Sequence, residues 1–297
     1  MRPIETERRR DYFGKVTNAD IWRDFALRAD DVIVTTPPKC GTTWTLNIVM
    51  MLIHGKVVPD AGNRETAPWL DCAFRDRPAI ARFLDGLERR RCIKSHTPMD
   101  GIPYAAEPTY IVVYRHPADV HFSFRSHAEN MKENRLVHMF PPDERVGFLN
   151  FVGGAMSEGD ADLLTLASLV NHYAQAKARA AGGNVHFFHY ADMSRDPRGQ
   201  IARLAGIMTV TLSPQLLDDL SEANTFASMR RVVEQSETRF HESSPFRVQA
   251  SFFNSGTSNK WKGRLSDADL EQFEARIAAL LPPEDAAWLC WGDTRQA

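Results

Sequence analysis

The segment from Asp31 to Ile53 constrains the fold more strongly than any other part of this sequence. It opens with an apolar, β-branched run at residues 32–36, which is typical of a buried strand. Apolar side chains then recur with the i, i+3, i+4, i+7 spacing of a helical core face, at Leu46, Val49, Met50 and Ile53. Gly55 is well placed to end this helix. The sequence therefore predicts a strand, a tight loop and a helix, in that order.

The loop at residues 37–44, PPKCGTTW, has the composition of an anion-binding turn. The first turn of a helix leaves backbone N–H groups unpaired, and the helix dipole favours negative charge there. Gly41 permits close backbone approach, Thr42 and Thr43 can donate to oxygen anions, and Lys39 adds a point charge. An ordinary strand-to-helix turn with a solvated lysine is the alternative. The chain contains no G-x-x-x-x-G-K-[ST] string, so the loop is not a Walker A motif.

Strand-like and helix-like segments alternate along the rest of the chain. Further strands are expected at residues 92–93, 109–114 and 185–190. Helices are expected within residues 1–30, 77–90, 131–160, 161–180, 195–206, 213–220 and 266–292, and a long mobile loop at 236–260. This alternation predicts an α/β fold with a central parallel sheet flanked by helices. We assign residues 1–297 to a single domain.

Composition excludes several classes of protein. The formal net charge is −2, so no global basic excess indicates nucleic acid as a partner. The cysteines at positions 40, 72, 92 and 290 form no C-x-x-C pair, so neither a metal site nor a redox motif is expected. The charged N-terminus lacks an apolar leader, and the apolar run Ile48–Ile53 is too short for a membrane span. We therefore expect a cytoplasmic location.

Polar residues follow three of the predicted strands at the point where each strand ends. Lys94 and His96 follow the second strand, Arg115 follows the third with Ser123 two helical turns later, and Tyr190 closes the fourth. In open α/β sheets, ligands bind outside the carboxyl ends of the strands. These residues are therefore candidates for one site together with the loop. Taken singly, a loop histidine with a local hydrogen bond and an arginine in a surface ion pair are the alternatives.

Six segments, in order along residues 37 to 262, resemble the motifs of sulfotransferases that use 3′-phosphoadenosine 5′-phosphosulfate (PAPS). The loop is similar to Y-P-K-S-G-T-T-W, with Pro37 in place of tyrosine and Cys40 in place of serine. The other matches are K-S-H-T-P at 94–98 to K-T-H-L-P, residues 115–123 to R-N-P-x-D-x-x-x-S, Y-A-D-M at 190–193 to Y-E-D-M, residues 224–229 to T-S-F-x-x-M, and residues 252–261 to F-M-R-K-G-x-x-G-D-W. The runs around Trp69 and 94–101 look more like bacterial members.

This resemblance implies a P-loop-like nucleotide-binding core, PAPS as co-substrate, no metal, and a role for each matched residue. His96 is the implied catalytic base, and Lys39 and Lys94 stabilise the transferred charge. Ser123 restrains Lys39 and, with Arg115, holds the 3′-phosphate. The implied nucleotide-binding residues are Lys39, Cys40, Gly41, Thr42, Thr43, Trp44, Arg115, Ser123, Tyr190, Asn224, Thr225, Phe226, Met229, Phe253, Asn254, Ser255 and Gly256. The implied activity is sulfuryl transfer to a hydroxyl or amine of a small molecule.

The last segment departs from the family pattern. Asn254 and Ser255 stand where the family brings an arginine and a lysine to the 3′-phosphate, which predicts weaker donor binding because charge-assisted hydrogen bonds are stronger than neutral ones. Lys260, where the family has aspartate, and Lys262 or Arg264 are candidates for partial compensation. A non-catalytic nucleotide-binding relative is therefore one alternative function. A kinase-like phosphotransferase is another, although no acidic residue that could hold magnesium follows a strand.

The sequence leaves the acceptor open. Phenols, steroids, glycolipids and antibiotic-like metabolites all fit, and a lipophilic alcohol or phenol is the expected class. For Trp69 we favour a packing role over a place in the acceptor wall. The family's K-x-x-x-T-V-x-x-x-E dimer motif is absent from the sequence, and both a monomer and a dimer remain open.

Overall fold

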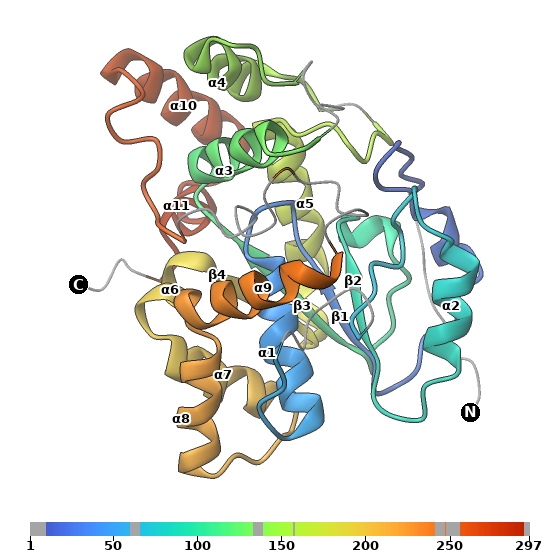
Figure 1. Ribbon diagram of the computed structural model, residues 1–297. Coiled ribbons are helices and arrows are strands. Elements are labelled where there is room, and N and C mark those ends of the chain that lie inside the picture. Colours follow the sequence, from blue (N-terminus) through green and yellow to red (C-terminus); the bar gives the residue numbers. More distant parts are fainter. Residues whose placement is uncertain are drawn as a thin grey trace.

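A four-stranded parallel sheet forms the centre of the molecule (Figure 1). The computed structural model describes residues 10–59, 66–132, 139–156, 158–240, 247 and 256–293, except for the side chains of 236–240. The strands are β1 (Val32–Thr35), β2 (Cys92–Ser95), β3 (Thr109–Tyr114) and β4 (Val185–His189), in the order β2-β1-β3-β4. The predicted parallel sheet is confirmed, and its carboxyl ends lie at one edge.

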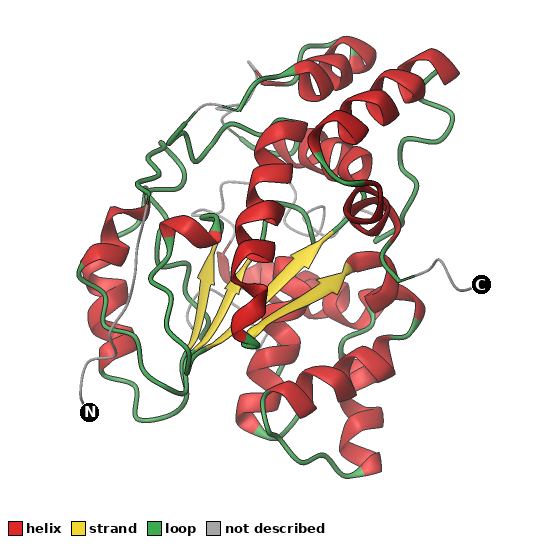
Figure 2. Ribbon diagram, turned by 180° about the vertical axis from the view of Figure 1, so that it is seen from behind, coloured by secondary structure: helices red, strands yellow, loops and turns green. Residues whose placement is uncertain are grey.

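Helices cover both faces of this sheet, because successive strand residues point to opposite sides. One core contains Ile33, Ile93 and Val112 and includes side chains of α5 (Leu166–Arg179), which lies behind the sheet in Figure 1 and in front of it in Figure 2. The other core contains Val32, Val34, Ile111 and Val113, together with α1 (Thr42–His54) and α7 (Pro197–Ile207). The near-continuous apolar strands follow from this two-sided burial.

The remaining helices lie around this sandwich, and several begin with proline at the first helical position, as at Pro117, Pro214 and Pro283. They are η1 (Ala19–Arg23), α2 (Arg77–Asp85), η2 (Met99–Gly101), α3 (Pro117–Glu129), α4 (Glu144–Gly153), η4 (Ala180–Gly182), α6 (Tyr190–Arg195), α8 (Pro214–Ala223), α9 (Phe226–Phe240), α10 (Asp267–Leu280) and α11 (Pro283–Trp291). The helices expected at 77–90, 131–160, 161–180, 195–206, 213–220 and 266–292 are thus confirmed, with shifted ends.

Two expectations from the sequence are wrong. In the described part of residues 1–30, the chain forms only the short η1, because residues 13 and 17 pair in isolated bridges with Asp160 and Cys72 and hold the segment extended. The expected loop at 236–260 begins too early, because α9 continues to Phe240. The hydroxyl of Thr225 accepts from the N–H of Ser228 and caps this helix. Most of the remaining loop lies outside the described residues.

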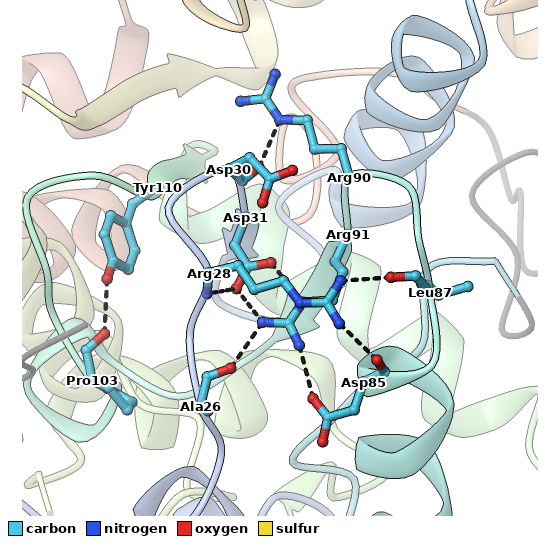
Figure 3. A network of polar contacts seen from close by, with 10 residues as sticks. All are labelled: Ala26, Arg28, Asp30, Asp31, Asp85, Leu87, Arg90, Arg91, Pro103 and Tyr110. Atoms are coloured by element: carbon cyan, nitrogen blue, oxygen red, sulfur yellow. Dashed lines mark hydrogen bonds and ion pairs between the residues drawn. The ribbon is translucent and has the colours of Figure 1, made fainter. Parts of the chain in front are cut away.

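A buried ion pair joins the amino ends of β1 and β2, at the edge opposite the strand ends discussed below (Figure 3). Nε and Nη2 of Arg91 donate to the two carboxylate oxygens of Asp31 at 2.6 and 2.5 Å, and both side chains are fully buried. Nη1 of Arg91 donates to Asp85 of α2 at 3.0 Å. This pair therefore fastens α2 to the sheet without taking part in the candidate site.

Candidate functional site

The loop between β1 and α1 has the backbone shape that an anion requires. Lys39 and Gly41 adopt left-handed φ values of 68° and 110°, and α1 begins at Thr42 without a side-chain cap on its first turn. A Cβ atom at Gly41 would lie 3.1 Å from the ring of Tyr190. A larger residue is therefore strained there both by this close contact and by the left-handed backbone. The uncapped N–H groups and the helix dipole make this turn able to bind an anion, and that role stays a prediction from the sequence.

Burial separates the roles of the loop side chains. The thiol of Cys40 is fully buried, and this burial raises its pKa to about 12, so it is no nucleophile at neutral pH. Oγ1 of Thr42 forms a hydrogen bond with Oγ1 of Thr36, whereas Thr43 is only partly buried. The indole of Trp44 meets the ring of Tyr190 edge-on, with 5.6 Å between ring centroids. The two aromatic rings predicted to contact the adenine are therefore neighbours.

His96 is held in one tautomer beyond the end of β2. Its Nδ1 lies 2.7 Å from the carbonyl oxygen of Thr36. Because a carbonyl only accepts, Nδ1 carries the proton and Nε2 is left with its lone pair. Burial, and then the charge of Lys94, lower the pKa of His96 well below 6.5. The imidazole is therefore neutral at pH 7 and able to accept a proton at Nε2.

Trp69 belongs to the surroundings of His96. Its ring lies under the ammonium of Lys94, 4.4 Å from Nζ to the centroid, and meets the His96 ring edge-on at 4.8 Å. Phe74, which is 56% exposed, contacts the other side of this aromatic group at 6.1 Å from Trp69. The structure thus places Trp69 against two candidate catalytic residues, where the sequence favoured plain packing. Lys94 itself lies within β2 and not beyond its end.

Asp71 is a buried carboxylate that the sequence analysis missed. It is fully buried and accepts hydrogen bonds from the indole N–H of Trp69 at 2.5 Å and of Trp22 at 3.0 Å. The hydroxyls of Ser95 and Thr97, on either side of His96, also donate to it. Asp71 therefore fixes both the ring beside His96 and the backbone that carries His96. Its position two residues after Trp69, in an otherwise apolar run, was the available signal.

Lys39 is paired with a histidine that the sequence analysis also missed. Nζ of Lys39 lies 3.4 Å from Nδ1 of His127 on α3. Burial, and then the charges of Lys260, Arg115 and Lys94, lower the pKa of Lys39 to about 7. Burial, and then the charges of Lys39 and Lys94, lower the pKa of His127 to about 3, so its neutral ring accepts from the ammonium. The spacing from Ser123 could have indicated it, since residues four apart share one face of a helix.

Arg115 lies at the end of β3 with its guanidinium buried; only 5% of the residue is exposed. The guanidinium lies over the ring of Tyr190, 4.4 Å from Cζ to the centroid. Its terminal nitrogens donate to the carbonyl of Thr257 at 2.7 Å and to that of Lys39 at 3.4 Å. Within the described ranges, Nε has no hydrogen-bond partner. The arginine therefore joins the loop, Tyr190 and the C-terminal segment.

Residues 224–229 hold the start of α9 in place through side-chain hydrogen bonds and packing. The side-chain amide of Asn224 is fully buried. Its Oδ1 accepts from Nδ2 of Asn47 at 2.8 Å, and its Nδ2 donates to the carbonyl of Leu220 at 2.8 Å. It thereby fastens the start of α9 to α1, and its contact with a nucleotide stays a prediction. Phe226 packs against Gly256, where an added Cβ would lie 2.5 Å from the ring. The hydroxyl of Tyr190 donates to the carbonyl of Gly256 at 2.9 Å.

Two further predicted site residues are buried. Ser123 is buried on α3, one turn before His127, and Met229 is buried on α9. Phe253, Asn254 and Ser255 lie outside the described residues. Among the residues that are described, no three His, Cys, Asp or Glu side chains gather into a metal site. Nor does any helix in those ranges have the length and apolar character to cross a membrane.

The described site therefore combines a neutral imidazole with four cations along one sheet edge. The cations are Lys39, Lys94, Arg115 and Lys260; the last three lower the pKa of Lys39, and Arg115 lowers that of Lys260. Such a site can bind a ligand with several negative charges and remove a proton from a second molecule.

A family model for the sulfotransferase domain matches residues 29–282. Over 300 residues the chain is 29% identical to a glycolipid sulfotransferase of Mycobacterium bovis, covering 90% of each protein. It is 23% identical to sulfotransferase 1A1 of Mus musculus over 274 residues, again covering 90% of each. The family match favours sulfuryl transfer over the kinase-like alternative.

Solved structures share the fold. A mouse sulfotransferase complexed with 3′-phosphoadenosine 5′-phosphate (PAP) superposes with a TM-score of 0.73 at 14% identity, over 96% of this chain and 98% of that one. Retinol dehydratase in complex with retinol and PAP gives a TM-score of 0.71 at 20% identity, over 89% and 85%. The fold, the phosphate-type loop and the long family match agree, and this chain belongs to the sulfotransferase family.

Proposed function

We propose that this chain transfers the sulfuryl group of PAPS to a hydroxyl or amine of a small-molecule acceptor, with His96 as general base. The observation that carries the proposal is the hydrogen bond from Nδ1 of His96 to the carbonyl of Thr36 at 2.7 Å. It leaves Nε2 as a proton acceptor in a partly buried position near the charges of Lys94 and Lys39. Neutral imidazole suits a base that works near pH 7.

In the reaction, the acceptor oxygen or nitrogen attacks sulfur in line with the leaving phosphate oxygen. Its proton passes to Nε2 of His96, a new bond to sulfur forms, and the bond between sulfur and the phosphate oxygen breaks. The electron pair leaves with PAP. Lys39 and Lys94 stabilise the charge that develops on the transferred and bridging oxygens, since electrostatic stabilisation and positioning dominate such group transfers.

The nucleotide is held by the loop and by the strand ends. Thr42, Thr43 and the uncapped N–H groups of α1 bind the 5′-phosphate, and Cys40 and Gly41 shape the loop around it. Arg115 and Ser123 bind the 3′-phosphate. Trp44 stacks on the adenine, and Tyr190 contacts it. Related structures contain PAP, which supports the same donor here.

For the acceptor we propose a lipophilic alcohol or phenol. Trp69 and the exposed Phe74 place aromatic surface next to His96, and such surface favours an apolar molecule with one polar end. Named relatives act on glycolipids, and a related structure contains retinol, which supports an alcohol on an apolar body. We propose a single domain over residues 1–297 and a cytoplasmic location, where PAPS would have to be supplied.

The test is PAP release from PAPS in the presence of a panel of alcohols, phenols and amines. We expect acceptor-dependent turnover in the wild type and a loss of roughly 10² to 10⁴ in turnover for His96→Ala, with PAP affinity retained. His54→Ala at the far end of α1 is the matched control. Full turnover by His96→Ala would remove the base role. A magnesium requirement would favour a phosphotransferase, and nucleotide binding without turnover over the whole panel would favour a non-catalytic relative.

A further inference from the structure

The segment that starts at Gly256 lies directly on the predicted 3′-phosphate residue. Arg115 donates to the carbonyl of Thr257 at 2.7 Å, and Tyr190 donates to that of Gly256 at 2.9 Å. The sequence places Asn254 and Ser255 immediately before it, where the resemblance calls for two basic residues. Another residue of the same segment is therefore a candidate source of positive charge.

Asp119 anchors the following residues by their backbone. Its carboxylate accepts from the N–H of Asn259 at 2.9 Å and from that of Lys260 at 2.6 Å. Asn259 adopts a left-handed φ of 63°, which turns both N–H groups towards one carboxylate. Asp119 is 1% exposed, and its Oδ2 lies 4.0 Å from Nε of Arg115. The backbone of Lys260 is thus fixed close to Arg115.

The charge of Lys260 interacts with the charges of Arg115 and Lys39. Burial and the charge of Arg115 lower the pKa of Lys260 to about 8, although Asp119 acts in the opposite direction. Lys260 also lowers the pKa of Lys39, and does so more than Arg115 or Lys94. Both oxygens of Asp119 already accept backbone hydrogen bonds, and Nε of Arg115 has no hydrogen-bond partner in the described part of the chain. Crowded cations with a buried, unpartnered donor form a site for an anion.

The two other candidate cations of this segment are directed elsewhere. Lys262 is exposed, with its ammonium 5.8 Å from the centroid of the Trp261 ring. The guanidinium of Arg264 lies over the ring of Phe122 at 5.2 Å and pairs with Glu144 at 3.5 Å. Of the three residues that the sequence offered as compensation, Lys260 is the one whose backbone is bound next to Arg115 and whose charge acts on Lys39.

We propose that Lys260 is a phosphate ligand that binds the 3′-phosphate of the donor together with Arg115, and so supplies the positive charge that Asn254 and Ser255 lack. This inference rests on the proposed function and names a binding residue of the same site. It makes discrimination between 3′-phosphorylated and plain adenine nucleotides depend on this lysine as well as on Arg115. In the family motif that residues 252–261 resemble, an aspartate usually stands at the position of Lys260.

The test is calorimetric titration of the wild type, Lys260→Ala and Lys262→Ala with PAP and with 5′-AMP. We expect Lys260→Ala to weaken PAP binding roughly 10- to 100-fold, the range for a charged hydrogen bond, and to leave 5′-AMP binding nearly unchanged. Lys262→Ala, which loses the same charge from an exposed position, should leave both affinities unchanged. Lys260→Arg should recover most of the lost PAP affinity.

Each outcome separates this inference from the proposed function. Equal PAP affinity in the wild type and in Lys260→Ala overturns the role of Lys260 and leaves the donor assignment standing. Equal weakening of PAP and 5′-AMP also overturns it, because the 3′-phosphate is then not the group bound. No preference for PAP over 5′-AMP in the wild type overturns the donor assignment itself. Lys260→Met, which keeps the length of the side chain, provides a second variant if the alanine variant unfolds.

Discussion

Nζ of Lys39 lies 3.4 Å from Nδ1 of His127, and the two residues are 88 positions apart in the sequence. The imidazole is neutral because burial and the neighbouring lysines lower its pKa to about 3. A neutral ring that accepts from an ammonium favours the charged form of Lys39. It therefore opposes burial and the three cations that together lower the pKa of Lys39 to about 7.

Replacing His127 by phenylalanine should lower the pKa of Lys39 below about 7, because the ammonium loses an acceptor while the opposing cations remain. Since the ammonium is the active form, kcat/KM should fall more at pH 8 than at pH 6. The measurement is the pH profile of kcat/KM for PAPS, with His54→Phe as the control variant. A uniform loss at all pH values would indicate a purely structural role for His127.

Donor binding should take up protons near neutral pH. The pKa of Lys39 is lowered to about 7 in the free protein, and an adjacent anion raises it. At pH 8 about nine-tenths of Lys39 is neutral before PAP binds, so roughly 0.9 proton is taken up at this residue, and uptake should vanish well below pH 7. Lys260, with a pKa lowered to about 8, adds a smaller share.

Proton uptake is measured by titration with PAP in buffers of different ionisation enthalpy. In Lys39→Arg the charge is permanent, so only the share of Lys260 should remain. Uptake that stays unchanged in this variant would place the titrating group elsewhere.

The acid side of the pH profile should be flat. The pKa of His96 lies well below 6.5 because burial and Lys94 disfavour the imidazolium, so the base stays neutral as the pH falls through the usual range of histidine. The profile of kcat/KM reports the free enzyme, and it should show no decline from about pH 7 to about pH 5.5. An acid limb centred near pH 6.5 that disappears in His96→Asn would contradict the buried, neutral state of this residue.

Stability should depend on the ion pair at the opposite edge of the sheet. Arg91→Met leaves the buried carboxylate of Asp31 without its partner, which should lower the free energy of unfolding by about 3–5 kcal/mol. Arg198→Met is the control, because its pair with Asp218 at 2.7 Å is exposed and should contribute less than about 1 kcal/mol. Both are measured by urea unfolding.

The binding site provides the second readout for these two variants. PAP affinity of the folded Arg91→Met protein should match the wild type, because Arg91 lies at the amino ends of β1 and β2. Equal stability losses in the two variants would contradict the stabilising role of the buried pair. A large loss of PAP affinity would contradict its separation from the binding site.

Local sequence patterns were sufficient to predict the strands of the sheet and the loop between β1 and α1. The strand at 109–114 was predicted with its observed ends, and the strand–loop–helix at 32–54 follows from periodicity and from glycines that end or start helices. The loop side chains are neighbours in the chain, so their grouping required no tertiary information. The parallel arrangement then brought Lys94, His96 and Arg115 to one edge, because the carboxyl ends of parallel strands meet there.

Tertiary packing decided what these residues touch. Asp71 reaches Ser95 and Thr97, His127 reaches Lys39, and the segment after Gly256 reaches Arg115 over a separation of 142 residues. No sequence periodicity encodes such contacts, because they depend on how α3 and the C-terminal segment pack against the sheet. For the same reason the N-terminal segment was mistaken for a helix: its extended backbone is held by bridges to distant residues. The sequence alone determined which chemistry the chain carries, and the packing of distant segments decided its charge states and its partners.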